Sequence, residues 1–478
     1  MSDCCLSTES RPAEKEADLI IVGGGSAAFA GALKGLESGA RIVMINDGII
    51  GGTCVNVGCV PSKTLIRAAE AHHRAHHAFD GIQSRSWLTD FKAVIAQKDQ
   101  LVASLRQKKY SDLIEGHPDV EYLSGKAVIK DAHTVKVADR KIRGEKILIA
   151  TGASPYIPPV PGLREAGVMT STEAFEMKRL PETLIVLGGR YIALELAQIF
   201  ARFGTKVTVL QRSPRILPDE SPEFSETLCG YLRAEGIDIR TGVSLKSAWR
   251  KKEGIVLTAD IGGEEAVFSS PHVVAATGRR ANTKGLGLEA VGVALGPQGE
   301  MVVDDILESA VQGIFGAGDV IGAPQFVYTA AYEGALAVEN ALTGQGKKRD
   351  YRALPWVIFT DPQAAGAGMD EAQAKNAGID AEAVTLSMAQ VPRALAARDT
   401  RGWITLVRDR ATDRLVGGRI LAPEGGELVM EISLALKYGI TATELSKAFH
   451  PYLTNSEALK LAALSFRKSV DQLSCCAV

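Results

Sequence analysis

The sequence lacks the features that mark secreted, membrane-embedded and nucleic-acid-binding proteins. Its 478 residues include only 7 cysteines, too few for a disulfide scaffold in a chain of this length. The first residues have no cationic segment followed by an apolar stretch, so we expect no signal peptide. No apolar run approaches the length of a membrane span. The formal net charge of -2 offers no basic excess for nucleic acid, and we predict a cytoplasmic protein.

Two copies of one strand–turn–helix–strand pattern are present instead. The first runs from an apolar strand at 19–22 through a small-residue helix to a strand at 41–45. The second runs from a strand at 183–187 to a strand at 206–210. Such units build doubly wound parallel sheets. The sequence therefore predicts an α/β fold with two Rossmann-like dinucleotide-binding domains.

The other segments complete the predicted domain plan. Residues 65–115 have helical periodicity, and a proline-rich linker follows Thr151-Gly152. Strands at 403–408 and 415–421, with helices after them, indicate a separate α+β domain. The expected boundaries are a flexible tail at 1–17, a first nucleotide domain at 18–160, a second at 161–285, a central domain at 286–350 and an interface domain at 351–478.

The first glycine loop fits the pattern G-x-G-x-x-A. Gly23 allows the tight turn, Gly25 lets the backbone approach a pyrophosphate, and Ala28 keeps helix and strand close. The helix start supplies free N–H groups for the phosphates. The acidic residue expected after the second strand is replaced by Asn46, which still offers one acceptor to a ribose hydroxyl.

The second loop, Gly188-Gly189-Arg190-Tyr191-Ile192-Ala193, has arginine in place of the middle glycine. Its next strand ends without an acidic residue and is followed by arginines, which favours the 2′-phosphate of NADP over NAD. The alternative is that these arginines only face solvent. The predicted nicotinamide-nucleotide residues are Gly188, Arg190, Ala193, Gln211, Arg212 and Arg215.

Cys54 and Cys59 lie in the string GGTCVNVGCVPSK. Five residues of regular helix rise about 7.5 Å. That exceeds the Cα separation a disulfide tolerates, so pairing requires a distorted helix, which Gly58 makes possible. A helix start lowers a thiol pKa, and the cation of Lys63 stabilises a nearby thiolate. The alternative of two structural thiols is disfavoured by the specificity of the string.

This string resembles the active site of the pyridine nucleotide-disulfide oxidoreductases, and the likeness extends over nearly the whole chain from Asp18. The resemblance implies a homodimer that binds FAD and NADPH. It implies that Cys54 is the interchange thiol, that Cys59 contacts the flavin, that Lys63 pairs with Glu195 and that Tyr191 covers the nicotinamide pocket. The residues implied to bind FAD are Gly23, Gly25, Ala28, Gly48, Thr53, Lys63, Ala127, Thr151, Gly152, Asp319 and Val327.

Two departures separate the chain from the disulfide reductases of that family. Those enzymes carry a histidine five residues before a C-terminal glutamate, as general acid–base for the leaving thiol. Counting back from Glu457 gives Tyr452, while His450 lies two residues earlier. The chain also ends in Cys475-Cys476, and adjacent thiolates are good ligands for a soft cation.

With these departures the chain is similar to the mercuric reductase branch of the family. The resemblance implies reduction of thiol-bound Hg(II) to Hg(0), with Cys475 and Cys476 of one subunit passing the metal to Cys54 and Cys59 of the other, and Tyr452 beside them. It also suggests a form without an N-terminal heavy-metal domain. The alternatives are a disulfide reductase, perhaps of the thioredoxin reductase type, and a protein that binds mercury without turnover.

Two further clusters have open interpretations. Cys4-Cys5 is either a metal collector or part of a tail without function. His72, His73, His76 and His77 could chelate a metal, but a solvated helix face is the favoured reading.

Overall fold

The computed structural model describes residues 16–75 and 79–469. The chain forms two compact units. Unit 1 comprises Met1–Val60, Asp99–Ser154 and Arg279–Arg349, and unit 2 comprises Pro61–Lys98, Pro155–Gly278 and Asp350–Val478. The division falls inside α3 (Cys59–Arg74) and α4 (Phe91–Arg106). These two units are each made of several chain segments and do not test the five consecutive domains predicted from the sequence. The predicted boundaries remain a prediction.

Unit 1 is built on a parallel sheet in the order β3-β2-β1-β6, with β16 parallel to β6. The first four residues of β6, Arg140–Arg143, pair with β5, and β5 pairs with β4, which gives an antiparallel extension of the sheet. The strands are β1 (Ala17–Val22), β2 (Ile42–Asn46), β3 (Val120–Ser124), β4 (Ala127–Asp131), β5 (Thr134–Val137), β6 (Arg140–Ile149) and β16 (Ile314–Gly316). Their apolar runs are almost wholly buried, as parallel strands covered on both faces require.

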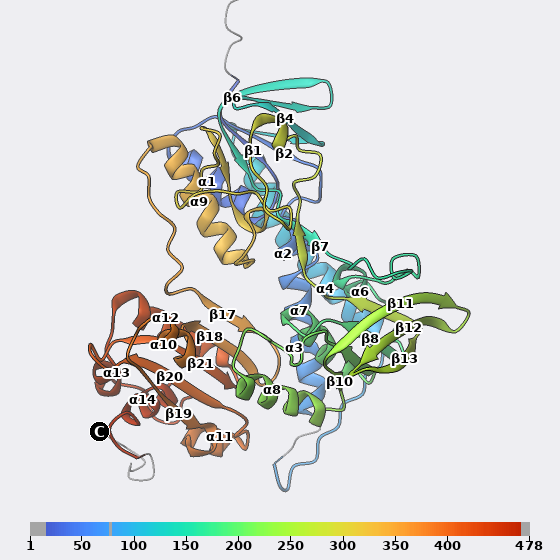
Figure 1. The fold of residues 1–478 in the computed structure, drawn as a ribbon, viewed down its shortest axis with the longest axis vertical. Coiled ribbons are helices and arrows are strands. Elements are labelled where there is room, and N and C mark those ends of the chain that lie inside the picture. Colours follow the sequence, from blue (N-terminus) through green and yellow to red (C-terminus); the bar gives the residue numbers. More distant parts are fainter. Residues whose placement is uncertain (1–15, 76–78, 470–478) are drawn as a thin grey trace, which may run out of the picture. The chain divides into compact units, whose positions relative to one another are not determined.

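Two helices of unit 1, α1 (Ser26–Glu37) and α9 (Val327–Thr343), lie side by side (Figure 1). A Cβ on Gly334 would stand 2.1 Å from the carbonyl oxygen of Ala27, so the two helices touch through their backbones. This close contact holds the first turn of α1 against the middle of α9. Short pieces follow α4: a π-helical turn at Gln107–Ser111 and α5 (Asp112–Glu115).

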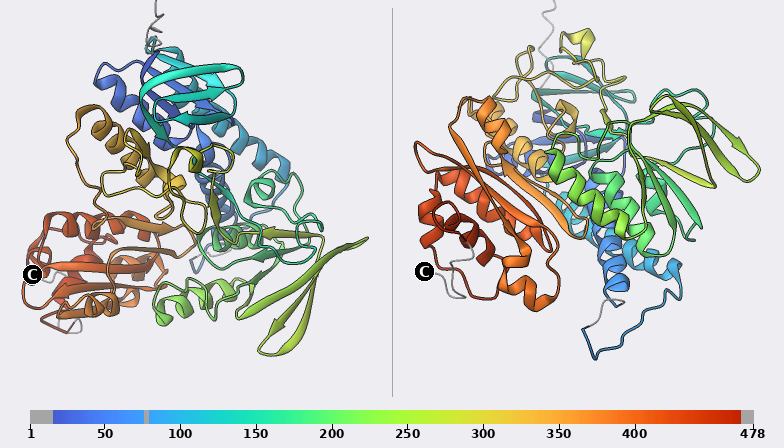
Figure 2. Two further views of the ribbon diagram at one scale, coloured as in Figure 1. Left: turned by 45° about the horizontal axis from the view of Figure 1, so that its top comes forward. Right: turned by 60° about the horizontal axis from the view of Figure 1, so that its bottom comes forward.

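Unit 2 contains a second parallel sheet in the order β10-β9-β8-β14 and a separate antiparallel meander, β11-β12-β13 (Figure 2). The strands are β8 (Thr183–Leu187), β9 (Lys206–Leu210), β10 (Asp238–Arg240), β11 (Val243–Lys251), β12 (Gly254–Ile261), β13 (Glu264–Ser270) and β14 (His272–Ala275), with helices α6 (Ser171–Phe175), α7 (Tyr191–Arg202) and α8 (Pro222–Ala234). Both predicted strand–helix–strand units are therefore confirmed.

The C-terminal part of unit 2 is an antiparallel sheet in the order β17-β18-β21-β20-β19. Its elements are β17 (Pro355–Ile358), β18 (Gln363–Gly368), α10 (Glu371–Asn376), β19 (Ala381–Ser387), α11 (Pro392–Ala397), β20 (Trp403–Asp409), β21 (Leu415–Ala422), α12 (Gly425–Tyr438), α13 (Ala442–Lys447) and α14 (Glu457–Leu464). The sheet and helices share one apolar core, which confirms the predicted α+β fold.

One secondary-structure prediction is wrong in part. Helical periodicity extended the predicted helices over 65–115, but α3 ends at Arg74 and α4 begins at Phe91. Gly81 has a φ of +85°, and the carboxylate of Asp90 accepts the N–H of Lys92 at 2.9 Å. The Asp80-Gly81 pair is thus a turn signal that the periodicity masked.

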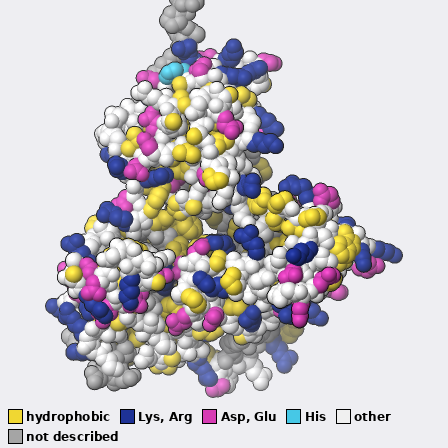
Figure 3. Space-filling model, in the orientation of Figure 1, with side chains coloured by type: hydrophobic (Ala, Val, Ile, Leu, Met, Phe, Trp, Pro, Cys, Tyr) yellow, Lys and Arg dark blue, Asp and Glu magenta, His cyan; other side chains and the backbone are white. Residues whose placement is uncertain are grey.

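The described residues contain no helix long and apolar enough to cross a membrane. On the face shown in Figure 3, basic and acidic side chains alternate over the surface, without a region of one sign. This distribution fits the absence of a basic excess in the sequence.

Candidate active site

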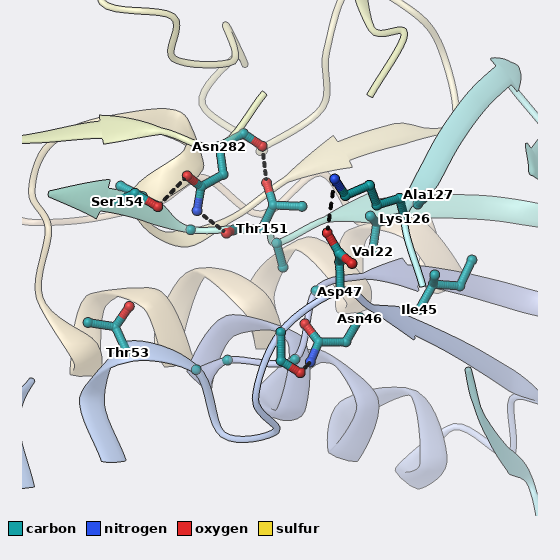
Figure 4. A pocket seen from close by; sticks show the side chains of 18 of the residues that line it. Val22, Ile45, Asn46, Asp47, Thr53, Lys126, Ala127, Thr151, Ser154 and Asn282 are labelled. Carbon is teal, nitrogen blue, oxygen red and sulfur yellow. Dashed lines mark hydrogen bonds and ion pairs between the residues drawn. The ribbon is translucent and has the colours of Figure 1, made fainter. Parts of the chain in front are cut away.

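A cavity of about 750 Å³ opens in unit 1 at the carboxyl ends of β1, β2 and β6 (Figure 4). Its wall also includes the residues at the start of α2 (Gly52–Asn56) and a loop around Asn282. Nucleotides bind at this edge of doubly wound sheets. Among the residues predicted to bind FAD, those on the wall are Gly23, Gly25, Gly48, Thr53, Ala127, Thr151 and Gly152.

The glycine loop leaves the backbone bare where a pyrophosphate is expected. Gly23 has a φ of +141°, and a Cβ there would stand 2.1 Å from the carbonyl oxygen of Ala150. A Cβ on Gly52, whose φ is +65°, would stand 2.6 Å from the Cα of Gly25. Because α1 begins directly after Gly25, its free N–H groups face this bare backbone. The chain thus fits a dinucleotide such as FAD at this cavity.

Four residues predicted to bind FAD do not lie on the cavity wall: Ala28, Lys63, Asp319 and Val327. Ala28 is fully buried in the core between α1 and the sheet, where it keeps the helix close to the strands. Val327 is the first residue of α9. Asp319 lies 3.5 Å from Arg279; burial raises the pKa of its carboxyl, and the guanidinium opposes that shift.

Arg279, which sequence reasoning did not assign to the site, connects three parts of it. Its guanidinium lies 3.2 Å from the Thr53 hydroxyl, donates to the carbonyl oxygen of Ala153 and faces Asp319. Its side chain is only 12% exposed, so this position is fixed. The available signal was the repeated Thr-Gly turn, because Arg279 directly follows Thr277-Gly278.

Asn282 and Lys126 are further wall residues that the sequence did not reveal (Figure 4). The amide of Asn282 donates to the Thr151 carbonyl at 2.9 Å and accepts from the Ser154 hydroxyl at 2.8 Å. Lys126 lies 4.0 Å from Asp47. The contacts of Asn282 join segments more than a hundred residues apart in the chain, and Lys126 and Asp47 are also distant in sequence, so no local pattern predicts them.

Asn46 is held in place at the end of β2. Its amide nitrogen donates to the Gly48 carbonyl at 2.7 Å and to the Tyr122 hydroxyl at 2.9 Å. With the nitrogen used in this way, the side chain retains its oxygen as an acceptor at the cavity wall. The substitution of amide for carboxylate therefore keeps an acceptor for a ribose hydroxyl and removes the charge.

The helix that carries the two cysteines is interrupted between them. Cys54 lies in α2, which ends at Asn56, and Cys59 is the first residue of α3. At the break Val57 has φ -138° and ψ 7°, away from helical values. The distortion that pairing requires is therefore present. Both cysteines are half-buried, and Thr53 and Val57 beside them line the cavity.

Lys63 and Glu195 form an ion pair within unit 2. The ammonium lies 2.8 Å and 3.0 Å from the two carboxylate oxygens, and the Phe359 N–H donates to the same carboxylate at 3.0 Å. Lys63 also stands 4.5 Å from the centre of the Phe359 ring. The Glu195 side chain is only 7% exposed. This is the pair that the resemblance implies.

The second loop accommodates Arg190 without strain. Gly188 makes the tight turn, with a φ of +117°, and a Cβ there would meet the Ala276 carbonyl oxygen at 2.4 Å. Arg190 has a φ of -112°, which any residue adopts, and its guanidinium lies 3.1 Å from Asp219. Ala193 is fully buried under the start of α7.

The residues after β9 lie beside this loop. The Gln211 side chain is buried against Gly189 and donates to the Arg215 carbonyl at 3.3 Å. Arg215 donates to the Pro218 carbonyl at 2.9 Å, and within the described part of the chain its Nε is buried without a hydrogen-bond partner. Arg212 is exposed. Of the two arginines predicted to bind a 2′-phosphate, Arg212 is therefore exposed and Arg215 is partly buried.

Tyr191 starts α7 and packs edge-on against Trp356, with ring centres 6.1 Å apart. Burial raises the pKa of its phenol to about 12, and the negative charge of Glu220 adds to the shift. The phenol therefore stays protonated at neutral pH. This makes Tyr191 a hydrogen-bonding and packing group rather than a base.

Tyr452 and His450 occupy different environments in unit 2. Tyr452, before α14, is 49% exposed as a whole residue, while the side chain of His450 is only 6% exposed. A ring nitrogen of His450 lies 2.7 Å from a Glu431 carboxylate oxygen. Glu457 instead accepts the Leu453 N–H at 3.2 Å. The histidine is thus engaged with Glu431, and Tyr452 is the more accessible of the two.

Several predicted residues lie outside the described part of the chain: Cys4, Cys5, His76, His77, Cys475 and Cys476. His72 lies 2.6 Å from the Ser86 hydroxyl and stacks on Phe203, and His73 lies 3.9 Å from Glu235. Within 16–75 and 79–469, no three His, Cys, Asp or Glu side chains are grouped to hold a metal.

Comparison with solved structures and family profiles agrees with this geometry. Residues 17–334 match the profile of the pyridine nucleotide-disulphide oxidoreductases, and 354–463 match their dimerisation domain. The flavoprotein disulfide reductase RclA from Escherichia coli, solved as a Cu(II) complex, aligns with a TM-score of 0.85 at 30% identity over 95% of this chain and all of that one. That enzyme is a flavoprotein and the family is named for its pyridine nucleotide, in agreement with FAD and NADPH as the predicted cofactors.

Curated relatives narrow the relationship. The mercuric reductase of Staphylococcus aureus is 41% identical over 98% of this chain and 87% of its own length. That of Streptomyces lividans is 45% identical over 96% and 98%, and that of Shigella flexneri 44% over 96% and 82%. The chain therefore belongs to the pyridine nucleotide-disulphide oxidoreductase family, as a flavin oxidoreductase of its mercuric reductase branch.

Proposed function

We propose that the chain reduces thiol-bound Hg(II) to Hg(0) in the cytoplasm, with NADPH as the electron source and FAD as the carrier. The observation that best supports this proposal concerns the redox helix. Helix α2 forms part of the wall of the dinucleotide cavity, and the helix breaks between Cys54 and Cys59. The identity of 41–45% with mercuric reductases over nearly the whole chain supports the same assignment.

The cysteines carry the metal in this proposal. Cys475 and Cys476 of the partner subunit collect Hg(II) from a small-thiol complex, and Cys54 and Cys59 then take it by ligand exchange. Each new Hg–S bond releases one thiol, so the charge on the metal is unchanged until reduction. A bound flavin, once reduced by NADPH, would supply the two electrons, and the metal would leave as Hg(0) while the cysteine thiolates are retained. The dimerisation-domain match supports the homodimer that this transfer needs.

The environment of His450 favours a metal substrate over a disulfide. A disulfide reductase needs an accessible acid–base group for the leaving thiol. His450 is buried against Glu431, whereas the exposed Tyr452 is a phenol, which shuttles protons poorly at neutral pH. Transfer of Hg(II) between thiolates needs no such group. Tyr452 is instead proposed to hold the metal complex.

The choice of NADPH is assigned to the residues after β9. Arg212 is exposed, and Arg215 keeps a buried Nε with no partner among the described residues. A 2′-phosphate would satisfy such cations. Replacement of both by serine should raise the KM for NADPH at least tenfold and leave that for NADH within about twofold. A similar loss for both nucleotides would remove this assignment.

Mercury volatilisation tests the main proposal. Holoenzyme with NADPH, Hg(II) and excess small thiol should release Hg(0), with one NADPH oxidised per metal ion. Cys59→Ser should abolish release. Cys229→Ala is the matched control, because Cys229 is buried in α8 and is not one of the residues of the cavity wall. The double variant Cys475→Ala/Cys476→Ala should lose turnover of thiol-bound Hg(II) and keep flavin reduction by NADPH.

A disulfide reductase is the second candidate, and the likeness to RclA favours it. The same assay with oxidised glutathione and oxidised thioredoxin separates the two. NADPH oxidation by either disulfide, without Hg(0) release, would replace the mercury proposal. Tight Hg(II) binding with no NADPH oxidation would identify a sequestering protein.

A further inference from the structure

A buried arginine of the C-terminal antiparallel sheet reaches the loop that joins β9 to α8, residues 211–221. Arg419 lies on β21, and its side chain is 6% exposed. Its Nε donates to a carboxylate oxygen of Glu220 at 2.6 Å, and the Glu220 side chain is 12% exposed. A charge pair that is shielded from water therefore joins the sheet to the β9–α8 loop within unit 2.

The Arg419 guanidinium is held by the sheet itself. It donates to the carbonyl oxygens of Gly368 at 3.2 Å and Gly418 at 3.0 Å, and to the side-chain oxygen of Gln373 at 3.1 Å. It also lies 5.7 Å from the centre of the Trp356 ring. Because these partners fix the arginine independently of the loop, Arg419 determines where the loop carboxylate lies.

The β9–α8 loop is in turn bonded to the second glycine loop. The Leu217 N–H donates to the carbonyl oxygen of Gly189 at 2.9 Å, and Arg190 pairs with Asp219 at 3.1 Å. The same loop carries Arg215, whose Nε is buried without a hydrogen-bond partner among the described residues. A shift of this loop would therefore move the cation and the glycine loop together.

An apolar contact joins the same sheet to the other side of the glycine loop. Trp356 on β17 packs against the core that contains Leu217 and Phe224, with ring centres of Trp356 and Phe224 6.0 Å apart. Trp356 also packs edge-on against Tyr191, the first residue of α7. The C-terminal sheet thus contacts the segments on both sides of the predicted nicotinamide-nucleotide site.

We propose that Arg419, acting through Glu220, is a positioning residue that fixes the β9–α8 loop and thereby sets the preference for a nucleotide with a 2′-phosphate. The inference rests on the NADPH assignment of the proposed function. Cations that are already in place bind a phosphate more tightly, because no loop has to be ordered on binding. Without Arg419 the Glu220 carboxylate would be buried without its cation, so the loop should move to hydrate it.

Arg419→Met should therefore weaken binding of NADP⁺ more than binding of NAD⁺. In FAD-loaded enzyme, isothermal titration calorimetry should show a Kd for NADP⁺ that is raised about tenfold, while that for NAD⁺ stays within about twofold. Arg419→Lys keeps the charge without the planar fork and should recover part of the preference. These titrations use neither turnover nor mercury, so they are independent of the volatilisation assay.

Arg408→Met is the matched control. Arg408 lies on the neighbouring strand β20, is 16% exposed, and pairs with Glu382 at 2.8 Å and Asp413 at 2.7 Å. Its guanidinium lies 4.4 Å from the centre of the Phe466 ring, much as that of Arg419 lies over an indole. Both variants should lower the melting temperature, but Arg408→Met should leave both Kd values unchanged.

The ratio of the two Kd values decides the matter. If Arg419→Met keeps the NADP⁺ preference of the unaltered enzyme, or changes it only as Arg408→Met does, the proposal is overturned. If Arg419→Met does not fold, Glu220→Gln takes its place, and its Kd for NADP⁺ should rise about threefold, because the amide keeps the size and loses the charge. An unchanged Kd in that variant overturns the proposal equally. Equal Kd values for NADP⁺ and NAD⁺ in the unaltered enzyme would overturn the NADPH assignment itself, and this inference with it.

Discussion

Single residues in this protein are held by partners far away in the chain, and their predicted roles depend on those partners. Glu195 is nearly buried and its charge is balanced by Lys63, 132 residues earlier. His450 is drawn to Glu431, and Tyr452 is left accessible. A buried carboxylate that loses its cation is costly, because its desolvation is no longer offset.

Lys63→Met should therefore destabilise the protein. The Glu195 carboxylate would retain the Phe359 N–H and lose its cation, at a cost of about 1–3 kcal/mol in the free energy of unfolding. The double variant Lys63→Met/Glu195→Gln should be more stable than Lys63→Met alone. Thermal unfolding of the unaltered protein, the two single variants and the double variant measures the coupling energy between the two side chains. Additive changes would show that the pair contributes nothing.

Tyr452→Phe and His450→Gln should differ in their effects on activity. Loss of the accessible phenol is expected to lower kcat for thiol-bound Hg(II) at least tenfold. Loss of the ring that bonds Glu431 should leave kcat within about threefold and lower the melting temperature. Steady-state kinetics of both variants test this. The reverse order of kcat values would return the acid–base role to His450.

The Tyr191 phenol gives a pH prediction. Its pKa in the folded protein, about 12, is above the ordinary value of 10.0. A raised pKa contributes stability that is complete below pH 10 and is lost as the pH rises through about 12. Tyr191→Phe should remove one late-titrating tyrosine from the absorbance titration at alkaline pH. An unchanged number of late-titrating groups would contradict this assignment.

At the scale of elements, the cavity depends on close approach between two loops. The loop before α1 and the loop before α2 meet at Gly25 and Gly52, where there is no space for a side chain. Because α2 carries Cys54, the same contact places the redox helix at the wall of the cavity. The break between α2 and α3 then separates the two cysteines from regular helical spacing.

Gly52→Ala should abolish FAD retention. Its Cβ would enter the Gly25 backbone at 2.6 Å, so either loop must shift away from the nucleotide. Gly39→Ala is a matched control: Gly39 has a similar φ of +73°, against +65° for Gly52, and nothing within 4 Å of its would-be Cβ. Both variants bear the same kind of backbone strain. The ratio of bound flavin to protein after purification separates the effect of the steric clash from that of backbone strain. An equal loss of flavin in both variants would contradict the role of the clash.

At the scale of the whole molecule, the dimerisation-domain match implies a self-complementary surface. Helix α12 carries Met430, Leu434 and Tyr438, spaced four residues apart and each at least 46% exposed. Residues with this spacing share one face of a helix. An apolar helix face within the dimerisation domain is the natural candidate for the subunit contact.

Leu434→Glu should therefore weaken the dimer, because two like charges would meet near the symmetry axis of an isologous interface. Light scattering after size-exclusion chromatography should show a larger monomer fraction. Val267→Glu introduces the same charge at a 63% exposed site on β13 and should leave the dimer intact. An intact dimer in both variants would place the contact elsewhere.

Local patterns in the sequence determined the two nucleotide-binding units, the glycine loop, the position of the redox helix and its need for a break. Each of these depends on neighbouring residues: apolar strands, glycines at tight turns and the fixed rise of a helix. The helix predicted over 79–90 is wrong because the Asp80-Gly81 turn interrupts the chain there despite its helical periodicity.

Only the tertiary structure decided how Arg279 reaches Thr53, how Asn282 joins the cavity wall and which of His450 and Tyr452 is accessible. The contacts of Arg279 and Asn282 join segments more than a hundred residues apart in the chain, and that of His450 joins it to Glu431 on α12. Their partners are chosen by the path of the chain in three dimensions. No spacing in the sequence records that path, which is why these residues became visible only in the folded protein.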